Sequence, residues 1–242
     1  MPKFFVLPEN VHEDVIRITG EDVLHIKRVL RMKAGDKIHL CDSSGFDYDA
    51  VIDQMTDSGI ECRVTAKRES DTEPPIKVML FQGIPKGTKT DYIIQKNTEL
   101  GISDIVMCRL ARCVSKPEGS KKTERWQKIA ESAAKQSGRG LVPKVHEPVD
   151  LDTAISMMKK CDLAFVPYEC EENCSIKSVL KNSSDAKSIA FMIGPEGGFG
   201  IGEIEKLKNA GITPVSLGKR ILRTETAGEA VLTMIMYELG DI

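Results

Sequence analysis

Two glycine-containing segments hold most of the residues that could do chemistry. The first, "GPEGG" at 194–198, follows the apolar run 188–193 and therefore lies between a predicted strand and a predicted helix. The second, "LGKRILRTETA" at 217–227, follows the next predicted strand. Loops at the carboxyl edge of a parallel sheet are where open α/β folds bind ligands. The two segments therefore predict one ligand site at that edge.

The residues of the first loop do not match the common nucleotide-binding loops. A dinucleotide-binding fingerprint reads G-x-G-x-x-G, with an acidic residue roughly 20 positions later, whereas here Pro195 follows Gly194 and the next strand runs into "GKR" at 218–220. The chain has no Gly-Lys-Ser or Gly-Lys-Thr, so a phosphate-binding P-loop is also excluded. Glu196 would repel a pyrophosphate. The loop predicts a ligand that is neutral or cationic near Glu196, approached closely by glycine backbone and stiffened by the proline.

The second segment combines a helix start with an arginine. Thr226 could cap the last predicted helix, and Glu225 and Glu229 suit a helix N-terminus. Capping alone does not explain Arg223 beside them. An arginine there could hold a phosphate or a developing oxyanion, and the apolar pair at 221–222 could sandwich a planar base.

The elements that must position these loops alternate between strands and helices from Ile76 onward. Helices are predicted over 89–100, 124–137 and about 226–239, between nearly continuous apolar strands. This pattern predicts an α/β domain with a parallel sheet covered on both faces. Before residue 70, short β-rich runs and one helix from Glu21 to Lys33 predict a small barrel. The acidic segment "ESDTEPP" is the predicted linker, giving domains of residues 1–72 and 73–242.

Composition narrows the class of protein. The 242 residues are 41% hydrophobic with a net charge of −2, as in an ordinary globular protein. No apolar run approaches the roughly 20 residues of a membrane span, so no membrane association is expected. Seven scattered cysteines, an odd number without zinc-site spacing, indicate a reducing, cytoplasmic setting and no metal.

Basic residues gather in three places, at 25–33, at 116–139 and at 219–223. Each cluster alone is typical of a solvated helix face. Three clusters beside loops in a net-acidic chain also fit a polyanionic partner. Both interpretations stay open on charge alone.

The two glycine-containing segments together resemble the paired signatures of SPOUT-class S-adenosylmethionine-dependent methyltransferases. They are most similar to the ribosomal RNA small subunit methyltransferase E family, which methylates N3 of a uridine in 16S ribosomal RNA. The similarity extends over "HIKRVLRMKAGD" (25–36), "QKNTELGI" (95–102) and "RWQKIAESAAKQSGRGLVP" (125–143). One departure is Cys113 in "LARCVSKP", where a serine is expected.

The resemblance implies a PUA-like RNA-binding barrel followed by a SPOUT domain with a trefoil knot, a feature that general topology rules would exclude. It also implies a homodimer that binds S-adenosylmethionine and acts on 16S ribosomal RNA within the small subunit. The residues implied to line the cofactor pocket are Tyr168, Glu169, Gly194, Pro195, Glu196, Gly197, Gly198, Ser216, Leu217, Gly218, Ile221 and Leu222.

Catalysis at uridine N3 requires that the N3 proton leave. Arg223 is the candidate for binding phosphate or stabilising the uridine anion, and Glu196 or Glu225 for accepting the proton directly or through water. The candidates for RNA contact are His25, Lys27, Arg28, Arg31, Arg112 and Arg139.

Two other classes of protein fit parts of this pattern. A nicotinamide-dependent oxidoreductase would need the dinucleotide fingerprint and its acidic residue, which this chain lacks. An RNA-binding protein without activity would keep the basic clusters, but the intact glycine and "RTETA" segments argue against it.

Overall fold

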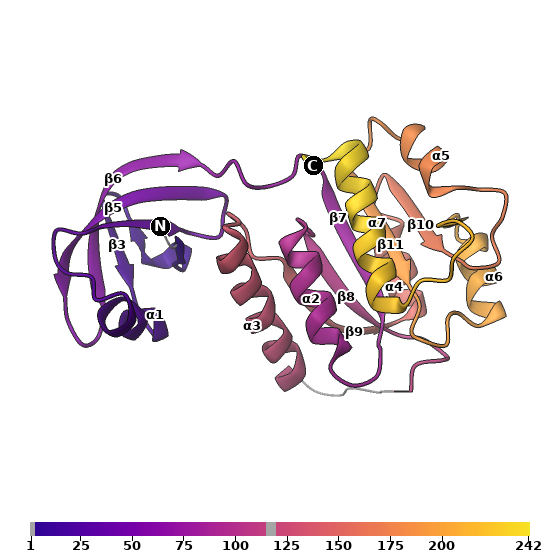
Figure 1. Cartoon of the computed structure of the whole chain (residues 1–242), viewed down its shortest axis with the longest axis horizontal. Helices are drawn as coiled ribbons and strands as arrows, with labels where there is room; N and C mark the ends of the chain where they lie inside the picture. The colour runs from indigo at the N-terminus through magenta and orange to yellow at the C-terminus, as the bar shows by residue number, and fades with distance from the viewer. Residues whose placement is uncertain (1–2, 115–119) are drawn as a thin grey trace. The chain divides into compact units, whose positions relative to one another are not determined.

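A computed structural model describes residues 3–114 and 120–242 of the chain, which forms two compact units (Figure 1). The first unit comprises Met1–Glu73 with Ala134–Val142, and the second comprises Pro74–Ala133 with Pro143–Ile242. Helix α3 (Ser120–Ser137) contributes its last residues to the first unit. Within residues 3–114 and 120–242, no helix has the length and apolar character needed to cross a membrane.

The first unit is built on a mixed six-stranded sheet. Its strands, in the spatial order β1-β4-β5-β6-β3-β2, pair antiparallel except for β1 with β4. The alternation of buried and exposed residues, as in β3 (Val15–Ile18), places one side chain of every two in the core. The other strands are β1 Lys3–Phe5, β2 Val11–His12, β4 Lys37–Cys41, β5 Phe46–Met55 and β6 Ile60–Glu69.

The helix of this unit is shorter than the sequence predicts. It consists of α1 (Glu21–Leu24) and a π-helical turn over His25–Val29, where the prediction continued to Lys33. Arg31 has a φ of 54°, in the left-handed region that ends a helix. The prediction of helix up to Lys33 was therefore wrong in its last turn.

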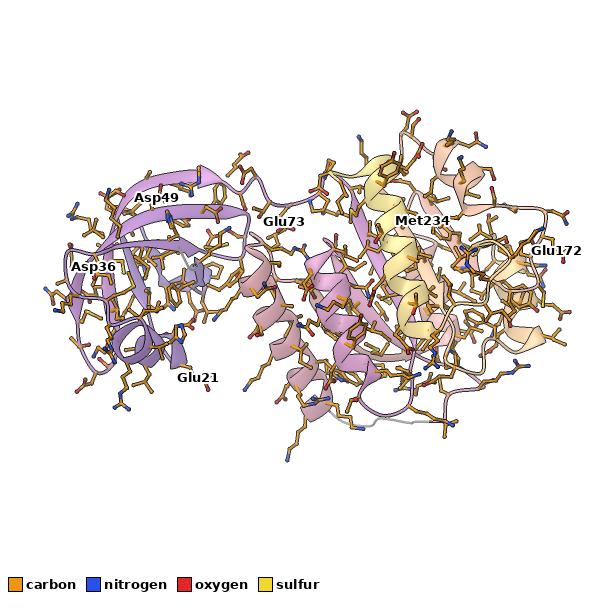
Figure 2. All side chains as sticks on the ribbon, in the orientation of Figure 1. Glu21, Asp36, Asp49, Glu73, Glu172 and Met234 are labelled. Atoms are coloured by element: carbon orange, nitrogen blue, oxygen red, sulfur yellow. The ribbon has the colours of Figure 1, made fainter. Side chains whose placement is uncertain are left out.

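Within the first unit, the segment 134–142 is held to the rest of the chain by a half-buried carboxylate. Glu73, which follows β6 (Figure 2), accepts hydrogen bonds from the Arg139 guanidinium at 2.6 Å and from the backbone N–H groups of Gly140 and Leu141 at 2.8 and 3.0 Å. Lys3 adds a hydrogen bond from its ammonium to the Gly138 carbonyl. These contacts give the first unit a second chain segment, which the linear division at residue 72 did not include.

The second unit is a parallel α/β sheet, as the sequence predicts. Its strands run in the order β12-β10-β11-β7-β8-β9, and every pairing is parallel. They are β7 Lys77–Gly83, β8 Asp104–Arg109, β9 Lys144–Asp150, β10 Leu163–Pro167, β11 Ser188–Ile193 and β12 Thr213–Val215.

Helices cover this sheet on its two faces. Side chains of α4 (Leu151–Met158) and α6 (Ile201–Asn209) join one core cluster with Phe81 and Met192. Helices α2 (Lys89–Glu99) and α7 (Thr224–Leu239) pack against each other, and α7 contacts β7 and β11 (Figure 1). The short α5 (Ile176–Lys181) lies against α7.

Candidate active site

A cavity of about 480 Å³ opens at the carboxyl ends of β10, β11 and β12. Its size is within the range of about 300 to 1,000 Å³ that is usual for small-molecule sites. Three loops, the first turn of α7 and one residue of α2 line it. The lining residues are Lys89, Pro167, Tyr168, Glu169, Ile193, Gly194, Pro195, Glu196, Gly197, Gly198, Phe199, Leu217, Gly218, Arg220, Ile221, Leu222, Arg223, Thr224 and Ala227.

The glycine loop after β11 is a tight turn, and Glu169 and Gly83 pack closely against it. The N–H of Gly198 donates to the Pro195 carbonyl at 2.9 Å, and Gly198 has a φ of 67°. A side chain at Gly198 would place its Cβ 3.0 Å from the Glu169 carboxylate, and one at Gly83 would lie 2.7 Å from Pro195. Gly83 must therefore be glycine, because β-carbons essentially never come within 3.0 Å of other atoms, and Gly198 is favoured as glycine by its left-handed backbone.

Thr224 joins the glycine loop to the start of α7. Its hydroxyl donates to the Gly194 carbonyl at 2.7 Å and accepts from the Gln82 side-chain amide at 2.9 Å. The same amide nitrogen donates to the Gly83 carbonyl at 2.8 Å. Gln82 is fully buried and Thr224 is 6% exposed, so these bonds are shielded from water. The relay of Gln82, Thr224 and Gly194 ties the end of β7, the glycine loop and α7 together.

Helix α7 begins two residues earlier than the sequence predicts. Arg223 is the N-cap and makes no side-chain capping bond, so Thr226 is not the cap. The helix starts at Thr224 because tertiary hydrogen bonds hold that residue in place. Arg223 consequently lies at the N-terminus of a 16-residue helix, on the wall of the cavity.

Glu196 is engaged by the residues that begin α2. Its carboxylate accepts from the Lys86 backbone N–H at 3.1 Å and pairs with the Lys89 ammonium at 3.2 Å. Burial acts to raise the pKa of Glu196, but the hydrogen bonds of its own N–H and of Lys86, together with Lys89, outweigh burial and lower that pKa. Lys89 also lies 3.3 Å from Glu225. Its hydrogen bond to Glu196, and then that to Glu225, raise the pKa of Lys89.

Most residues predicted to bind the cofactor line the cavity, with one exception. Ser216 is absent from the lining, and its hydroxyl instead accepts from the Gly218 N–H at 3.2 Å. Its backbone N–H donates to the Cys174 carbonyl, so Ser216 anchors the loop. Tyr168 does line the cavity, and its hydrogen bond with Cys170, followed by burial, raises the pKa of the phenol.

The three catalytic candidates lie near one another but differ in access to the cavity. Arg223 and Glu196 line it, whereas Glu225 does not. The Glu225 side chain is 18% exposed, and its Oε2 atom lies 3.3 Å from the Lys89 ammonium. Lys89 connects Glu225 to the cavity because it pairs with both carboxylates.

Sequence reasoning missed Lys89 and Gln82. Lys89 is the first residue of α2, where a cation opposes the helix dipole. That local conflict is a signal that compensating carboxylates lie nearby. Gln82 follows the apolar residues 78–81 of β7, and a polar residue at such a position predicts a buried hydrogen-bonding role.

The four RNA-contact candidates of the first unit lie on and after its helical turn. His25, Arg28 and Arg31 are exposed. Lys27 is half-buried, and its ammonium donates to the Thr56 carbonyl at 2.6 Å. Lys27 therefore holds the helical turn to the loop between β5 and β6, whereas the other three side chains are accessible.

The two candidates outside that turn differ in exposure. Arg112 is exposed and donates to the Gly197 carbonyl at 2.7 Å, so it braces the glycine loop. The Arg139 side chain is only 5% exposed and is paired with Glu73. Its contact with RNA stays a prediction, and the structure gives it a fastening role within the first unit. Lys116, part of the second basic cluster, lies outside the described residues.

Comparison with family models defines the class of protein. Residues 72–236 match the model described as RNA methyltransferase domain, and residues 18–65 match the RNA methyltransferase PUA domain. A parallel sheet with a ligand cavity at its carboxyl edge, preceded by a PUA domain, is therefore the architecture of an RNA methyltransferase.

Individual relatives make the assignment narrower. The chain is 37% identical to ribosomal RNA small subunit methyltransferase E of Bacillus subtilis, over 91% of this chain and 89% of the relative. A crystal structure of the enzyme with that name from Neisseria gonorrhoeae, bound to S-adenosyl methionine, is 31% identical with a TM-score of 0.90 and covers 100% of this chain and 99% of its own. A putative methyltransferase from Legionella pneumophila in complex with the same cofactor has a TM-score of 0.87 at 29% identity, covering 99% of this chain and 98% of its own.

The chain belongs to the ribosomal RNA small subunit methyltransferase E family. The predicted family and the α/β fold with an N-terminal PUA-like unit are thereby confirmed. The trefoil knot stays a prediction.

Proposed function

We propose that this protein transfers the methyl group of S-adenosylmethionine to N3 of a uridine in 16S ribosomal RNA. One observation carries the proposal most directly. One cavity is lined both by the glycine loop and by residues of the segment 217–227, among them Arg223. These are the two segments that resemble the family's signatures.

The residues of the cavity fit this cofactor, which supplies a methyl group on a positively charged sulfur. Leu217, Ile221 and Leu222 give apolar walls suited to a planar base. Glu169 brings a carboxylate beside Gly198, where a cation is stabilised. Glu196 is directed toward Lys89 and the N–H of Lys86, so Glu169 is the better placed of the two acidic residues to meet positive charge.

The substrate side of the reaction needs an anion-stabilising group and a proton acceptor. Uridine N3 loses its proton and gains the methyl group, and the negative charge passes through O2 and O4 before the new N–C bond forms. Arg223, at the N-terminus of α7, stabilises that charge together with the helix dipole. The proton goes to Glu196 directly or to Glu225 through a water molecule.

The partners and setting complete the proposal. The enzyme acts as a homodimer in the cytoplasm, on 16S ribosomal RNA within the small subunit. His25, Arg28 and Arg31 bind RNA phosphates, with Arg112 near the cavity, and Lys27 and Arg139 mainly hold these surfaces in shape. Phosphate contacts of this kind make RNA affinity fall steeply with salt.

The test is direct detection of the modified base. Small subunits and free 16S RNA that lack the modification are incubated with the enzyme and labelled S-adenosylmethionine, and the digested RNA is searched for 3-methyluridine. We expect the product from assembled subunits, and Arg223→Ala should lower kcat at saturating RNA by about 100-fold. Binding of S-adenosylhomocysteine without 3-methyluridine from either substrate would refute the proposed target. Light scattering of the purified protein tests the dimer.

A further inference from the structure

Lys89 occupies a position that the reaction does not yet explain. Its ammonium lies 3.2 Å from Glu196 Oε1 and 3.3 Å from Glu225 Oε2, and its side chain, 32% exposed, lines the cavity. Glu196 belongs to the glycine loop and Glu225 to the first turn of α7. One cation of α2 therefore joins the two segments that hold the candidate proton acceptors.

The distance between the Glu196 and Glu225 carboxylates determines how strongly they would repel each other without Lys89. Two oxygen atoms at 3.2 and 3.3 Å from one nitrogen are at most 6.5 Å apart. At this separation, two carboxylates without a cation between them resist ionising together, and the pKa of one is raised. With Lys89 present, each carboxylate has an ammonium partner within 3.3 Å.

Other charged groups around the pair do not replace Lys89. Within the described residues, the Glu196 carboxylate accepts a hydrogen bond from the Lys86 backbone N–H but pairs with no ammonium other than that of Lys89. Glu225 has its other charged neighbours on α7 and α2. Glu229 interacts electrostatically with Glu225, and Cys113 with Glu196. The other cations of the cavity wall are Arg220 and Arg223, and within the described residues neither pairs with Glu196 or Glu225. Arg223 is the group assigned to the substrate, and Lys96 of α2 is paired with Glu99 at 2.8 Å.

We propose that Lys89 is a positioning residue for methyl transfer, which rests on the proposed function. It holds the carboxylates of Glu196 and Glu225 together and ionised, so that an acceptor for the uridine N3 proton is available at neutral pH. In the step it supports, the N3–H proton passes to a carboxylate oxygen, and the N3 electron pair forms the bond to the methyl carbon. The bond between that carbon and the cofactor sulfur breaks, its electron pair stays on sulfur, and S-adenosylhomocysteine is left. Lys89 itself stays protonated, because its two anionic partners stabilise the ammonium form.

The experiment compares Lys89→Met, which removes the charge and keeps the stem, with Lys89→Arg, which keeps the charge. Lys96→Met is the matched control, since Lys96 is also a paired lysine of α2 but does not line the cavity. For each protein, kcat at saturating RNA and cofactor is measured from mildly acidic to mildly alkaline pH. S-adenosylhomocysteine affinity and melting temperature are measured on the same samples.

We expect the acidic limb of the Lys89→Met profile to move to higher pH, with kcat at neutral pH lowered by about 10- to 100-fold and recovering as the pH rises. Lys89→Arg and Lys96→Met should keep the wild-type profile. A loss in Lys89→Met that is equal at every pH, no loss at all, or an equal loss in Lys89→Arg would overturn the proposal.

A second readout does not depend on activity. Carboxylate carbon NMR titrations of the free protein, assigned with Glu196→Gln and Glu225→Gln, report the two groups directly. Lys89→Met should raise the pKa of one of them. Suppose that one carboxylate has a higher pKa in Lys89→Met than in the wild type, but the wild type makes no 3-methyluridine. The proposed function then fails, and the role of Lys89 in keeping the two carboxylates ionised stands. If the titrations of the wild type and Lys89→Met coincide, the role of Lys89 fails whatever the activity.

Discussion

Replacing Thr224 by valine tests whether the relay of Gln82, Thr224 and Gly194 builds the cavity. Valine keeps the branched shape and removes only the hydroxyl. The Gln82 amide nitrogen keeps its bond to the Gly83 carbonyl, but the buried Gly194 carbonyl loses its 2.7 Å donor. Leaving such a group unsatisfied costs about 1 to 3 kcal/mol. For a chain of this size that corresponds to a melting temperature lowered by about 2 to 10 °C.

The same change should weaken ligand binding, because the glycine loop loses its tie to α7. If the ligand must order a loosened glycine loop, the same cost of about 1 to 3 kcal/mol is subtracted from the binding free energy. At 1.4 kcal/mol for each factor of ten, affinity for S-adenosylhomocysteine then drops by up to about 100-fold. Calorimetric titration and thermal melts measure the two effects.

Two variants separate the hydroxyl from other causes. Thr224→Ser retains the hydroxyl and should bind nearly as well as the wild type. Thr233→Val removes a comparable hydroxyl of α7, bonded at 2.8 Å to the Glu229 carbonyl on an exposed turn, and should change stability by less than about 0.5 kcal/mol. If Thr224→Val binds and melts like the wild type, the relay does not support the site.

Three further changes probe other parts of the structure. Gly83→Ala places a Cβ 2.7 Å from Pro195, so we expect a loss of about 1 to 3 kcal/mol and weaker S-adenosylhomocysteine binding, by melts and calorimetry. Glu73→Ala removes the carboxylate that accepts from the Arg139 guanidinium and from the Gly140 and Leu141 N–H groups, and should destabilise the protein by about 1 to 3 kcal/mol in denaturant unfolding. Burial is the main cause that raises the pKa of Glu229, so the folded protein holds the proton of this carboxyl more tightly than the unfolded chain does. The folded state therefore loses stability as the pH rises from the unfolded pKa to the folded pKa of this group. Glu229→Gln should therefore raise the melting temperature at neutral pH, and the gain should vanish in acid.

Matched positions serve as controls for these three changes. A Cβ at Gly202 meets nothing within 4 Å, so Gly202→Ala should leave ligand binding intact. Glu69→Ala and Glu238→Gln alter exposed carboxylates and should change stability by less than about 0.5 kcal/mol. Equal effects in a variant and its control would contradict the local explanation. A gain for Glu229→Gln that persists in acid would mean that the carboxylate charge is not its source.

The cavity at the carboxyl edge was predictable from sequence because the direction of parallel strands brings the loops that line it to one edge of the sheet. Parallel strands end at one edge, so the glycine loop after β11 and the segment after β12 had to meet. Periodicity likewise predicted α2 as residues 89–100, and the structure gives Lys89–Glu99. These features depend on local patterns and on one topological rule.

The start of α7 could not be predicted in the same way. Threonine is a favoured N-cap and arginine is not, so capping preference selects Thr226 over Arg223. In the structure, the Thr224 hydroxyl is held by Gln82 and Gly194, residues 142 and 30 positions away in the chain. Bonds at such separation leave no periodic trace in the sequence, and they override a local preference worth about 1 kcal/mol.

Lys89 shows how a conflict with a local rule can point to function. A lysine at the first position of a helix is disfavoured by the helix dipole by about 0.3 to 1 kcal/mol. The carboxylates of Glu196 and Glu225, brought in by two separate loops, offset that cost. The two carboxylates thus make a lysine favourable at a position where the helix dipole opposes it. Since natural sequences break local rules mainly at functional sites, the conflict at Lys89 marks the same cavity that the glycine loop marks.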